Sequence, residues 1–349
     1  MSAELAEVQV HLDGGVGRIV LNRPRALNSL THGMITAVRA ALDDWAADER
    51  VHAVVLTGAG ERGLCAGADI RAMHDDAKAG GAGFRAFFRD EYRLNALIAR
   101  YPKPYVAVMD GITMGGGVGL SAHGAVRIVT ERSVVAMPET RIGLVPDVGG
   151  SRLLAHAPGE LGTHLGLTSG SMGPGDALLC GFADHFVPSE RIPALLDALT
   201  RTPDAAAAVV AAHAEPAPPA ALARQREWID ACYAADTVEE IVERLLDSGV
   251  PEAKEAAELV LGNSPTAVKA TLAALRRART LPSLEAVLDQ EYRISCAALE
   301  GHDLVEGIRA QVIDKDRNPR WSPASLAEVT EADVARLLAP REGDELGLA

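Results

Sequence analysis

Short apolar runs alternate with helical patterns along the first part of the chain, and this alternation limits the fold more than any other feature of the sequence. Residues 54–58, 105–109 and 126–129 are short and rich in valine, which is typical of buried strands. Residues 84–100, between two of these runs, have a helical pattern. A chain in which strands alternate with helices buries a sheet under helices, so the sequence predicts an α/β fold.

The chain opens with a predicted β-hairpin. Residues 8–12 and 18–21 are apolar-rich runs on either side of an Asp-Gly-Gly turn signal. Thr31 can cap a helix that continues to about residue 49, because the apolar residues in that segment recur three and four positions apart. This helix therefore has one face for the core.

The amino-acid composition of the sequence changes near residue 203. Residues 203–221 are rich in alanine and proline and form a predicted connector, although the Ala-Val stretch within it could be helical. The patterns beyond the connector are helical. We therefore predict an α/β domain at residues 1–202 that carries the candidate site, and a helical domain at residues 203–349.

Composition excludes several classes of protein. With 48% hydrophobic and 23% charged residues the chain has the balance of a globular protein, and no stretch reaches the roughly 18 uncharged apolar residues of a membrane span. The four cysteines include no CxxC pair, so we expect buried thiols instead of a zinc site or disulfides. The net charge of -14 repels nucleic acid and anionic membranes, and no leader pattern is present. We expect a cytoplasmic protein that binds neither.

Two glycine-rich segments, residues 63–70 and 111–121, directly follow predicted strands. The second contains three consecutive glycines, whose unshielded backbone N–H groups could bind an anion at the start of a helix. A donor from the first segment would complete an oxyanion hole if the fold brings the two together. Taken alone, such segments are more often tight turns. Neither has the spacing of a P-loop or a dinucleotide-binding loop, which argues against nucleotide hydrolysis and NAD chemistry.

A third segment, residues 137–150, contains two carboxylates in an unusual setting. Glu139 and Asp147 lie among apolar residues, prolines and glycines, where a carboxyl group can be partly dehydrated and therefore more basic. In isolation, a Pro-Glu pair before a glycine-rich turn is usually only the start of a helix or turn. The order of all three segments is what gives these carboxylates a chemical interpretation.

In this order the three segments, together with residues 22–30, resemble the crotonase superfamily of enoyl-CoA hydratases and isomerases. The resemblance implies a spiral of ββα units, a helical C-terminal domain that could assemble a homo-oligomer, and a coenzyme A thioester as substrate. The backbone N–H groups of Ala68 and Gly116 match the oxyanion hole of the superfamily. Its CoA-binding strips match Arg25, Ala26, Leu27, Ala66, Ala68, Asp69 and Ile70.

One glycine limits which reaction of the superfamily this chain can catalyse. Hydratases of this superfamily add water with two glutamates, one in the first turn after the triple glycine and one in the Pro-Glu pair. The second glutamate is present as Glu139, whereas the first position holds Gly119, which can neither donate nor accept a proton. The two-glutamate mechanism is therefore not available in its usual form.

Further segments indicate one branch of the superfamily. The segments that resemble the branch hydrolysing short-chain 3-hydroxyacyl-CoA thioesters, such as 3-hydroxyisobutyryl-CoA of valine breakdown, are residues 87–92, 111–121, 137–140, 146–150, 301–303, 306–310 and 313–316. This likeness extends into the helical part of the chain. It implies hydrolysis of 3-hydroxyisobutyryl-CoA to 3-hydroxyisobutyrate and CoA.

The resemblance also implies a role for each carboxylate. Glu139 would be the base or nucleophile, Asp147 its partner in placing water or the substrate hydroxyl, and Glu91 a contact to that hydroxyl, although an exposed helical glutamate explains Glu91 equally well. We expect no cofactor and no metal, because CoA is part of the substrate. Two alternatives remain open: an enoyl-CoA hydratase or isomerase that uses Glu139 with Asp147, and a non-catalytic acyl-CoA-binding protein.

Overall fold

The computed structural model describes residues 6–349, and its contacts divide the chain into two compact units. Unit 1 consists of the chain up to Ala68 with residues 93–135 and 172–220. Unit 2 consists of residues 69–92, 136–171 and 221–349. The two units therefore interleave along the chain. The predicted boundary at residue 203 divides the chain into two consecutive segments, and this division stays a prediction.

Unit 1 contains a six-stranded sheet in the order β1-β2-β3-β5-β7-β10. The predicted hairpin is confirmed, because β1 and β2 pair antiparallel with Val8 opposite Leu21 and Asp13 opposite Val16. The remaining neighbours pair in parallel, as an α/β fold requires. The strands are β1 (Val8–Asp13), β2 (Val16–Leu21), β3 (Ala53–Gly58), β5 (Tyr105–Met109), β7 (Val126–Val129) and β10 (His185–Phe186).

A second sheet has the order β4-β6-β8-β9, with strands β4 (Gly63–Cys65), β6 (Ile112–Met114), β8 (Val134–Ala136) and β9 (Ser171–Met172). From β3 to β8, consecutive strands alternate between the first sheet and the second. This alternation is the paired-strand part of the predicted ββα unit. The sequence patterns did not reveal these four strands, because a run of two or three residues has no measurable periodicity.

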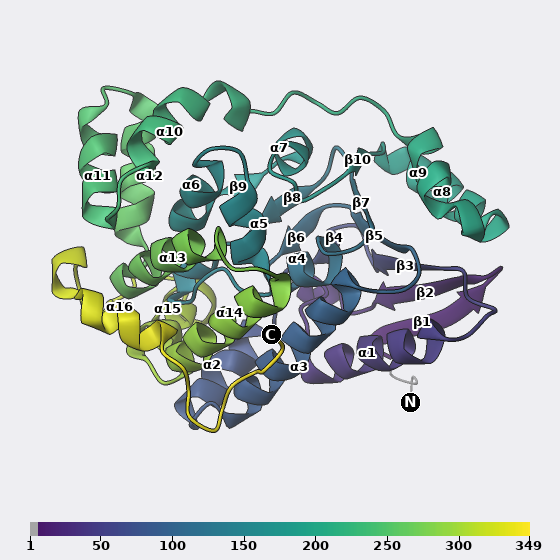
Figure 1. Ribbon diagram of the computed structural model, residues 1–349, viewed down its shortest axis with the longest axis horizontal. Coiled ribbons are helices and arrows are strands. Elements are labelled where there is room, and N and C mark those ends of the chain that lie inside the picture. Colours follow the sequence, from purple (N-terminus) through teal and green to yellow (C-terminus); the bar gives the residue numbers. More distant parts are fainter. Residues whose placement is uncertain (1–5) are drawn as a thin grey trace. The chain divides into compact units, whose positions relative to one another are not determined.

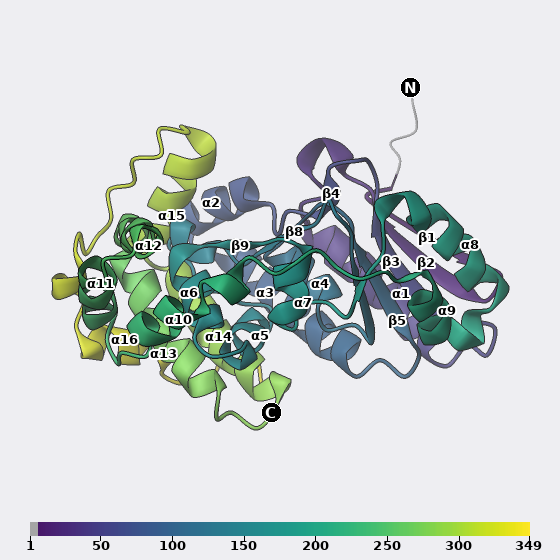
Figure 2. The ribbon, with the colours of Figure 1, turned by 90° about the horizontal axis from the view of Figure 1, so that it is seen from above.

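Helices cover both faces of the six-stranded sheet in unit 1. Figures 1 and 2 show α8 (Ile192–Arg201) and α9 (Ala206–His213) beside the sheet, and their apolar residues form one core with β2, β3, β5 and β7. Val16 of β2 faces this core. A Cβ on the next residue, Gly17, would lie 2.4 Å from the ring of Trp45, which places α1 (His32–Ala46) on the opposite face.

Two expectations about these helices can be compared with the structure. The predicted cap of α1 is confirmed, since the Thr31 side chain accepts a 3.2 Å hydrogen bond from the N–H of Met34. Residues 206–213 of the predicted connector form α9, and Val210 within it is completely buried. The Ala-Val stretch is therefore a packed helix, the alternative that the sequence left open. Unit 1 also contains α4 (Gly116–Ser121) and α7 (Pro174–Leu179).

Unit 2 is built mainly from helices, as predicted for the C-terminal part of the chain. Val145 packs with residues of α13, α14 and α16 in one apolar core. Among residues 6–349, every helix is too short or too polar to cross a lipid bilayer. The helix α3 (Ala82–Ala99) belongs to unit 2 as far as Tyr92 and to unit 1 beyond it. The other helices of unit 2 are α2 (Ile70–Lys78), α5 (Gly150–His156), α6 (Leu161–Thr168), α10 (Arg226–Tyr233), α11 (Val238–Asp247), α12 (Pro251–Gly262), α13 (Pro265–Ala278), α14 (Leu284–Leu299), α15 (His302–Ile308) and α16 (Glu331–Leu338).

Candidate active site

In unit 1 the two glycine-rich segments lie side by side. The strands β4 and β6 pair in parallel, so the segments after their carboxyl ends meet at the same edge of the second sheet. Ala68 follows β4, and Gly116 begins α4 directly after β6. The structure gives the backbone N–H of neither residue a partner among residues 6–349. Both N–H groups are therefore available to bind an anion.

The glycines of these segments allow the backbones of the two segments to approach each other closely. A Cβ on Gly117 would lie 2.5 Å from the carbonyl oxygen of Cys65, so a side chain there would push α4 away from β4. Gly67 has a φ of +92°, and its Cβ would lie 3.2 Å from the Met114 carbonyl oxygen and 3.6 Å from the Gly116 nitrogen. The tight-turn interpretation is compatible with the donor interpretation, which stays a prediction, because the glycines that allow the tight turns lie beside the N–H groups of Ala68 and Gly116.

The structure brings part of the predicted CoA-binding strips together. The N–H of Ala66 donates a 3.0 Å hydrogen bond to the carbonyl oxygen of Leu27. The side-chain amide of Asn28 donates to the carbonyl oxygens of Ala59 and Gly63, at 3.0 and 3.1 Å. Arg25 and Ala26 are exposed beside this junction. The remaining two members of the strips belong to unit 2, where the side chain of Asp69 caps the helix that begins at Ile70.

In unit 2 the three predicted carboxylates form one buried cluster. Glu91 lies in α3, Glu139 begins a short 3-10 helix, and Asp147 lies in the loop before α5; each side chain is nearly inaccessible to solvent. Burial and then the charge of Asp147 raise the pKa of both Glu91 and Glu139 well above the ordinary value. Because Glu91 is 1% exposed, its interpretation as a surface glutamate is wrong.

Asp147 differs from the two glutamates because it has a strong hydrogen-bond donor. The hydroxyl of Tyr92 lies 2.7 Å from Oδ2 of Asp147 and 2.8 Å from Oγ of Ser295. Burial raises the pKa of Asp147 and the hydrogen bond from Tyr92 partly offsets this rise, so that the pKa is raised to about 6. Asp147 therefore ionises more readily than the two glutamates beside it.

A fourth carboxylate, Glu291 of α14, completes the cluster. Its side chain is completely buried and accepts hydrogen bonds from the N–H groups of Gly149 and Ser151, at 2.7 and 3.1 Å. Burial raises the pKa of Glu291 to about 8. The sequence analysis missed it. The available signal was its position on α14, four residues before Ser295 and four after Val287, both buried, which places an acidic residue on the core-facing stripe.

Two oxygens of the cluster are buried without a hydrogen-bond partner among residues 6–349. They are Oε1 of Glu91 and Oε2 of Glu139. Buried carboxyl oxygens are nearly always hydrogen-bonded, so such atoms mark a place where a ligand or water binds. Both belong to residues that the sequence assigned to the site, and no group of side chains suited to a metal ion occurs in the same described part of the chain.

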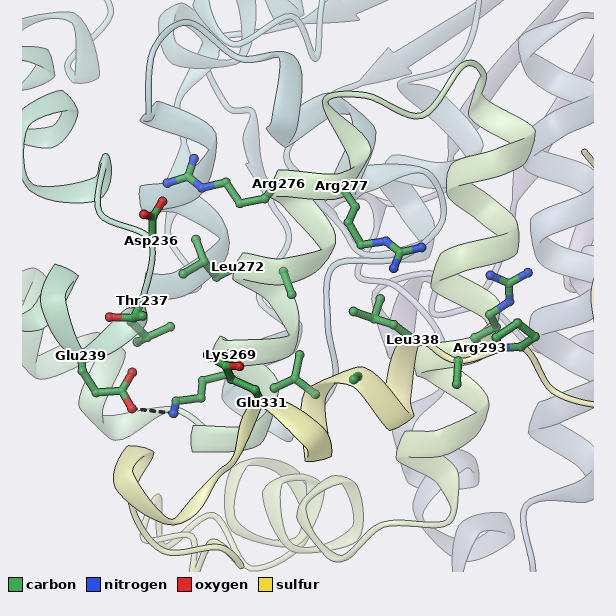
Figure 3. Close-up of a pocket in the computed structure, with 16 residues that line it drawn as sticks. Asp236, Thr237, Glu239, Lys269, Leu272, Arg276, Arg277, Arg293, Glu331 and Leu338 are labelled. Carbon is green, nitrogen blue, oxygen red and sulfur yellow. Dashed lines mark ion pairs between the residues drawn. The ribbon is translucent and has the colours of Figure 1, made fainter.

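A pocket of about 670 Å³ in unit 2 is lined by other residues (Figure 3). Apolar residues of α13 and α16 form much of its wall, and none of the predicted site residues lines it. Three of the four cations that line it form ion pairs: Lys269 with Glu239 at 2.5 Å, drawn as a dashed line in Figure 3, Arg276 with Glu160 at 2.8 Å, and Arg293 with Glu345 at 2.6 Å. This internal pairing reduces the positive charge that the pocket offers to an anionic substrate.

Backbone donors after paired parallel strands, on a fold whose strands alternate between two sheets, define a protein of the crotonase class. The enoyl-CoA hydratase/isomerase family model matches residues 16–338. The mitochondrial 3-hydroxyisobutyryl-CoA hydrolases of Gallus gallus and Danio rerio are 41% and 43% identical to this chain; each alignment covers 98% of it, and 91% and 92% of the relatives. A solved structure of a carnitinyl-CoA dehydratase from Mycobacterium thermoresistibile is 54% identical, covers 98% of both chains and superposes with a TM-score of 0.94. The chain belongs to the enoyl-CoA hydratase/isomerase family, and the predicted fold class is confirmed.

Proposed function

We propose that this protein hydrolyses the thioester of 3-hydroxyisobutyryl-CoA, releasing 3-hydroxyisobutyrate and CoA. The observation that carries the proposal is the burial of Glu139 and Asp147 in one cluster, in which Glu139 keeps an unpartnered carboxyl oxygen. The curated hydrolases that match nearly the whole chain support the same substrate. The reaction would place the enzyme in valine breakdown.

The chain has both groups that thioester hydrolysis needs. Attack on the thioester carbonyl creates a tetrahedral oxyanion, which the N–H groups of Ala68 and Gly116 would stabilise. Glu139, when ionised, would either take a proton from the attacking water or attack the carbonyl itself to form an anhydride. A raised pKa makes Glu139 a stronger base than an ordinary glutamate, which suits both routes.

Asp147 and Glu91 would then place the substrate and the water. Asp147 ionises first in the cluster, because it alone among the three accepts the hydrogen bond of Tyr92. Its negative charge favours a neutral Glu91, which can donate a hydrogen bond to the hydroxyl of the acyl group. This contact to the hydroxyl would make the enzyme selective for 3-hydroxyacyl thioesters over acyl thioesters without the hydroxyl group.

A second candidate is hydration or dehydration of an acyl-CoA, which the carnitinyl-CoA dehydratase at 54% identity favours. Gly119 argues against it. This glycine lies in the buried helix α4, where the two-glutamate mechanism requires a carboxylate. A hydratase would have to use Glu139 with Asp147 alone.

One assay separates the candidates. The purified protein is mixed with 3-hydroxyisobutyryl-CoA and, separately, with crotonyl-CoA, and both free thiol and loss of the double bond are followed. We expect rapid thiol release from the first and slow hydration of the second. Efficient hydration without thiol release would establish the hydratase instead, and activity in neither assay would favour a non-catalytic acyl-CoA-binding protein.

We also propose a cytoplasmic location, a homo-oligomer and catalysis without a cofactor. Cys65, Cys180, Cys232 and Cys296 are all buried, and no disulfide joins them in the described residues, which suits a reducing compartment. The names of the hydrolase relatives place those proteins in mitochondria. Cell fractionation tests the location, and light scattering of the purified protein tests the assembly.

A further inference from the structure

The helix α14 reaches the loop of Asp147 by two independent routes. Ser295 contacts the hydroxyl of Tyr92, which in turn hydrogen-bonds to Asp147. One helical turn earlier, Glu291 accepts hydrogen bonds from the N–H of Gly149 and from both the N–H and the hydroxyl of Ser151. Two residues of α14 therefore hold both sides of the segment that carries Asp147.

This segment has a backbone conformation that needs support. Val148, directly after Asp147, has a φ of +52°, the left-handed region that β-branched residues rarely adopt. The helix α5 begins two residues later, and its N-cap residue, Gly149, has no side chain to satisfy the first N–H groups. Glu291 satisfies two of them from another part of the chain. Its carboxylate therefore replaces the cap that the local sequence lacks.

We propose that Glu291 is a positioning residue: it holds the strained turn after Asp147 in place, and once it is ionised its negative charge acts on Glu139. The proposal rests on the hydrolase function proposed above. It extends that function to a residue that contacts neither the acyl group nor CoA in our account. Glu291 would determine the orientation of the Asp147 carboxylate and how readily Glu139 ionises.

The hydrogen bonds indicate which form of Glu291 the fold prefers. Backbone N–H groups can only donate, so Gly149 and Ser151 favour the ionised carboxylate and oppose the burial that raises the pKa of Glu291 to about 8. No lysine or arginine forms an ion pair with Glu291 within residues 6–349. The titratable groups that act on it are those of the cluster, Asp147 and Glu139, with Tyr92 of α3. An ionised Glu291 raises the pKa of Glu139, so the two groups are electrostatically coupled.

The decisive variant is Glu291→Gln, measured as thiol release from 3-hydroxyisobutyryl-CoA over a range of pH. The amide nitrogen of glutamine would face a backbone N–H, so one hydrogen bond is lost and the turn loosens. We expect kcat to fall roughly 10- to 100-fold with little change in KM. We also expect the acid limb, the low-pH side of the profile of kcat/KM against pH, to move to lower pH. The reason is that a neutral glutamine in place of Glu291 lowers the pKa of Glu139.

The matched control is Asp289→Asn on the same helix. Asp289 is also buried and also accepts two backbone hydrogen bonds, from the N–H groups of Leu348 and Ala349 at 2.9 and 3.1 Å. Its partners belong to the C-terminal segment and not to the Asp147 loop. We expect this variant to alter thermal stability while kcat and the acid limb remain near the wild-type values.

Ser151→Ala keeps the proposal testable if Glu291→Gln does not fold. It removes only the hydroxyl donor, so we expect a smaller fall in kcat and a movement of the acid limb in the same direction. If the wild-type enzyme is active and the folded variants have the same acid limb as the wild type, the role of Glu291 is overturned. A wild-type protein that releases no CoA would instead contradict the hydrolase function.

Discussion

The hydroxyl of Tyr92 lies 2.7 Å from Oδ2 of Asp147, and this contact decides how the carboxyl cluster is charged. A phenol has one proton to donate, so when it donates to Asp147 the hydroxyl of Ser295 must donate to Tyr92. The resulting chain of donors favours the ionised form of Asp147 although the residue is buried. The two glutamates nearby lack such a donor, and their pKa values are raised further.

Tyr92→Phe should therefore make Asp147 harder to ionise. Loss of the hydrogen bond raises the pKa of Asp147, so the part of the pH profile of thiol release that reports the ionisation of Asp147 should move to higher pH. At neutral pH we expect roughly a 10-fold fall in kcat, in line with the loss of one hydrogen bond to a charged group. The control is Tyr101→Phe, which removes a tyrosine hydroxyl that donates only to the carbonyl oxygen of Leu42. An unchanged pH profile in Tyr92→Phe would contradict this account of the cluster.

Asp147 should also make the folded protein less stable as the pH rises. Its pKa is raised from 3.8 to about 6, so the folded state binds more protons than the unfolded state between these pH values. The unfolding free energy should fall over that interval, by up to about 3 kcal/mol from this group. Asp147→Asn should reduce the dependence. Urea unfolding at pH 4.5 and pH 6.5 measures it, and an equal pH dependence in both proteins would contradict the prediction.

Gly67→Ala tests the backbone donors of unit 1. The substitution places a Cβ 3.2 Å from the Met114 carbonyl oxygen at a φ of +92°, so the loop that carries Ala68 must shift. Loss of one oxyanion donor typically costs ~10²- to 10³-fold in kcat, and we expect a fall of at least about 10-fold. Gly262→Ala is the control, because a Cβ there meets open space. Equal activity of the two variants would argue against an oxyanion hole at Ala68.

Chelation should leave the reaction unchanged. Within the described residues no cluster of histidine, cysteine and carboxylate side chains is arranged to hold a metal ion, and water can be activated by Glu139 alone. We expect EDTA to leave the rate of thiol release unaltered. Loss of activity that added Mg²⁺ or Zn²⁺ restores would reveal a metal that assists the reaction.

Local signals in the sequence predicted the local structure of this protein well. The apolar runs gave the hairpin and the parallel strands, and the cap at Thr31 was visible because its partner, Met34, lies three residues away. The strands of the second sheet are too short to have a pattern. They nevertheless determine the site in unit 1, because β4 and β6 place its two glycine-rich segments side by side.

The candidate site could be predicted only as far as its motifs are local. Glu139 and Asp147 stand in one short segment, whereas Glu291 contacts Gly149 from 142 residues away. No pattern of spacing connects such residues before the chain folds. Tyr92 and Ser295 were missed for the same reason, since a buried hydroxyl is recognised by its partner and not by its neighbours in the sequence.

The central claim is that Glu139 performs the chemistry of thioester hydrolysis, and Glu139→Gln tests it most directly. The substitution keeps the shape of the side chain but removes its basic and nucleophilic oxygen, while the backbone donors at Ala68 and Gly116 remain. General-base catalysis typically contributes ~10²- to 10⁴-fold. The measurement is thiol release from saturating 3-hydroxyisobutyryl-CoA, for which we predict a fall in kcat of at least about 100-fold with KM little changed. Hydrolysis by Glu139→Gln at a rate close to that of the wild-type enzyme would contradict the claim.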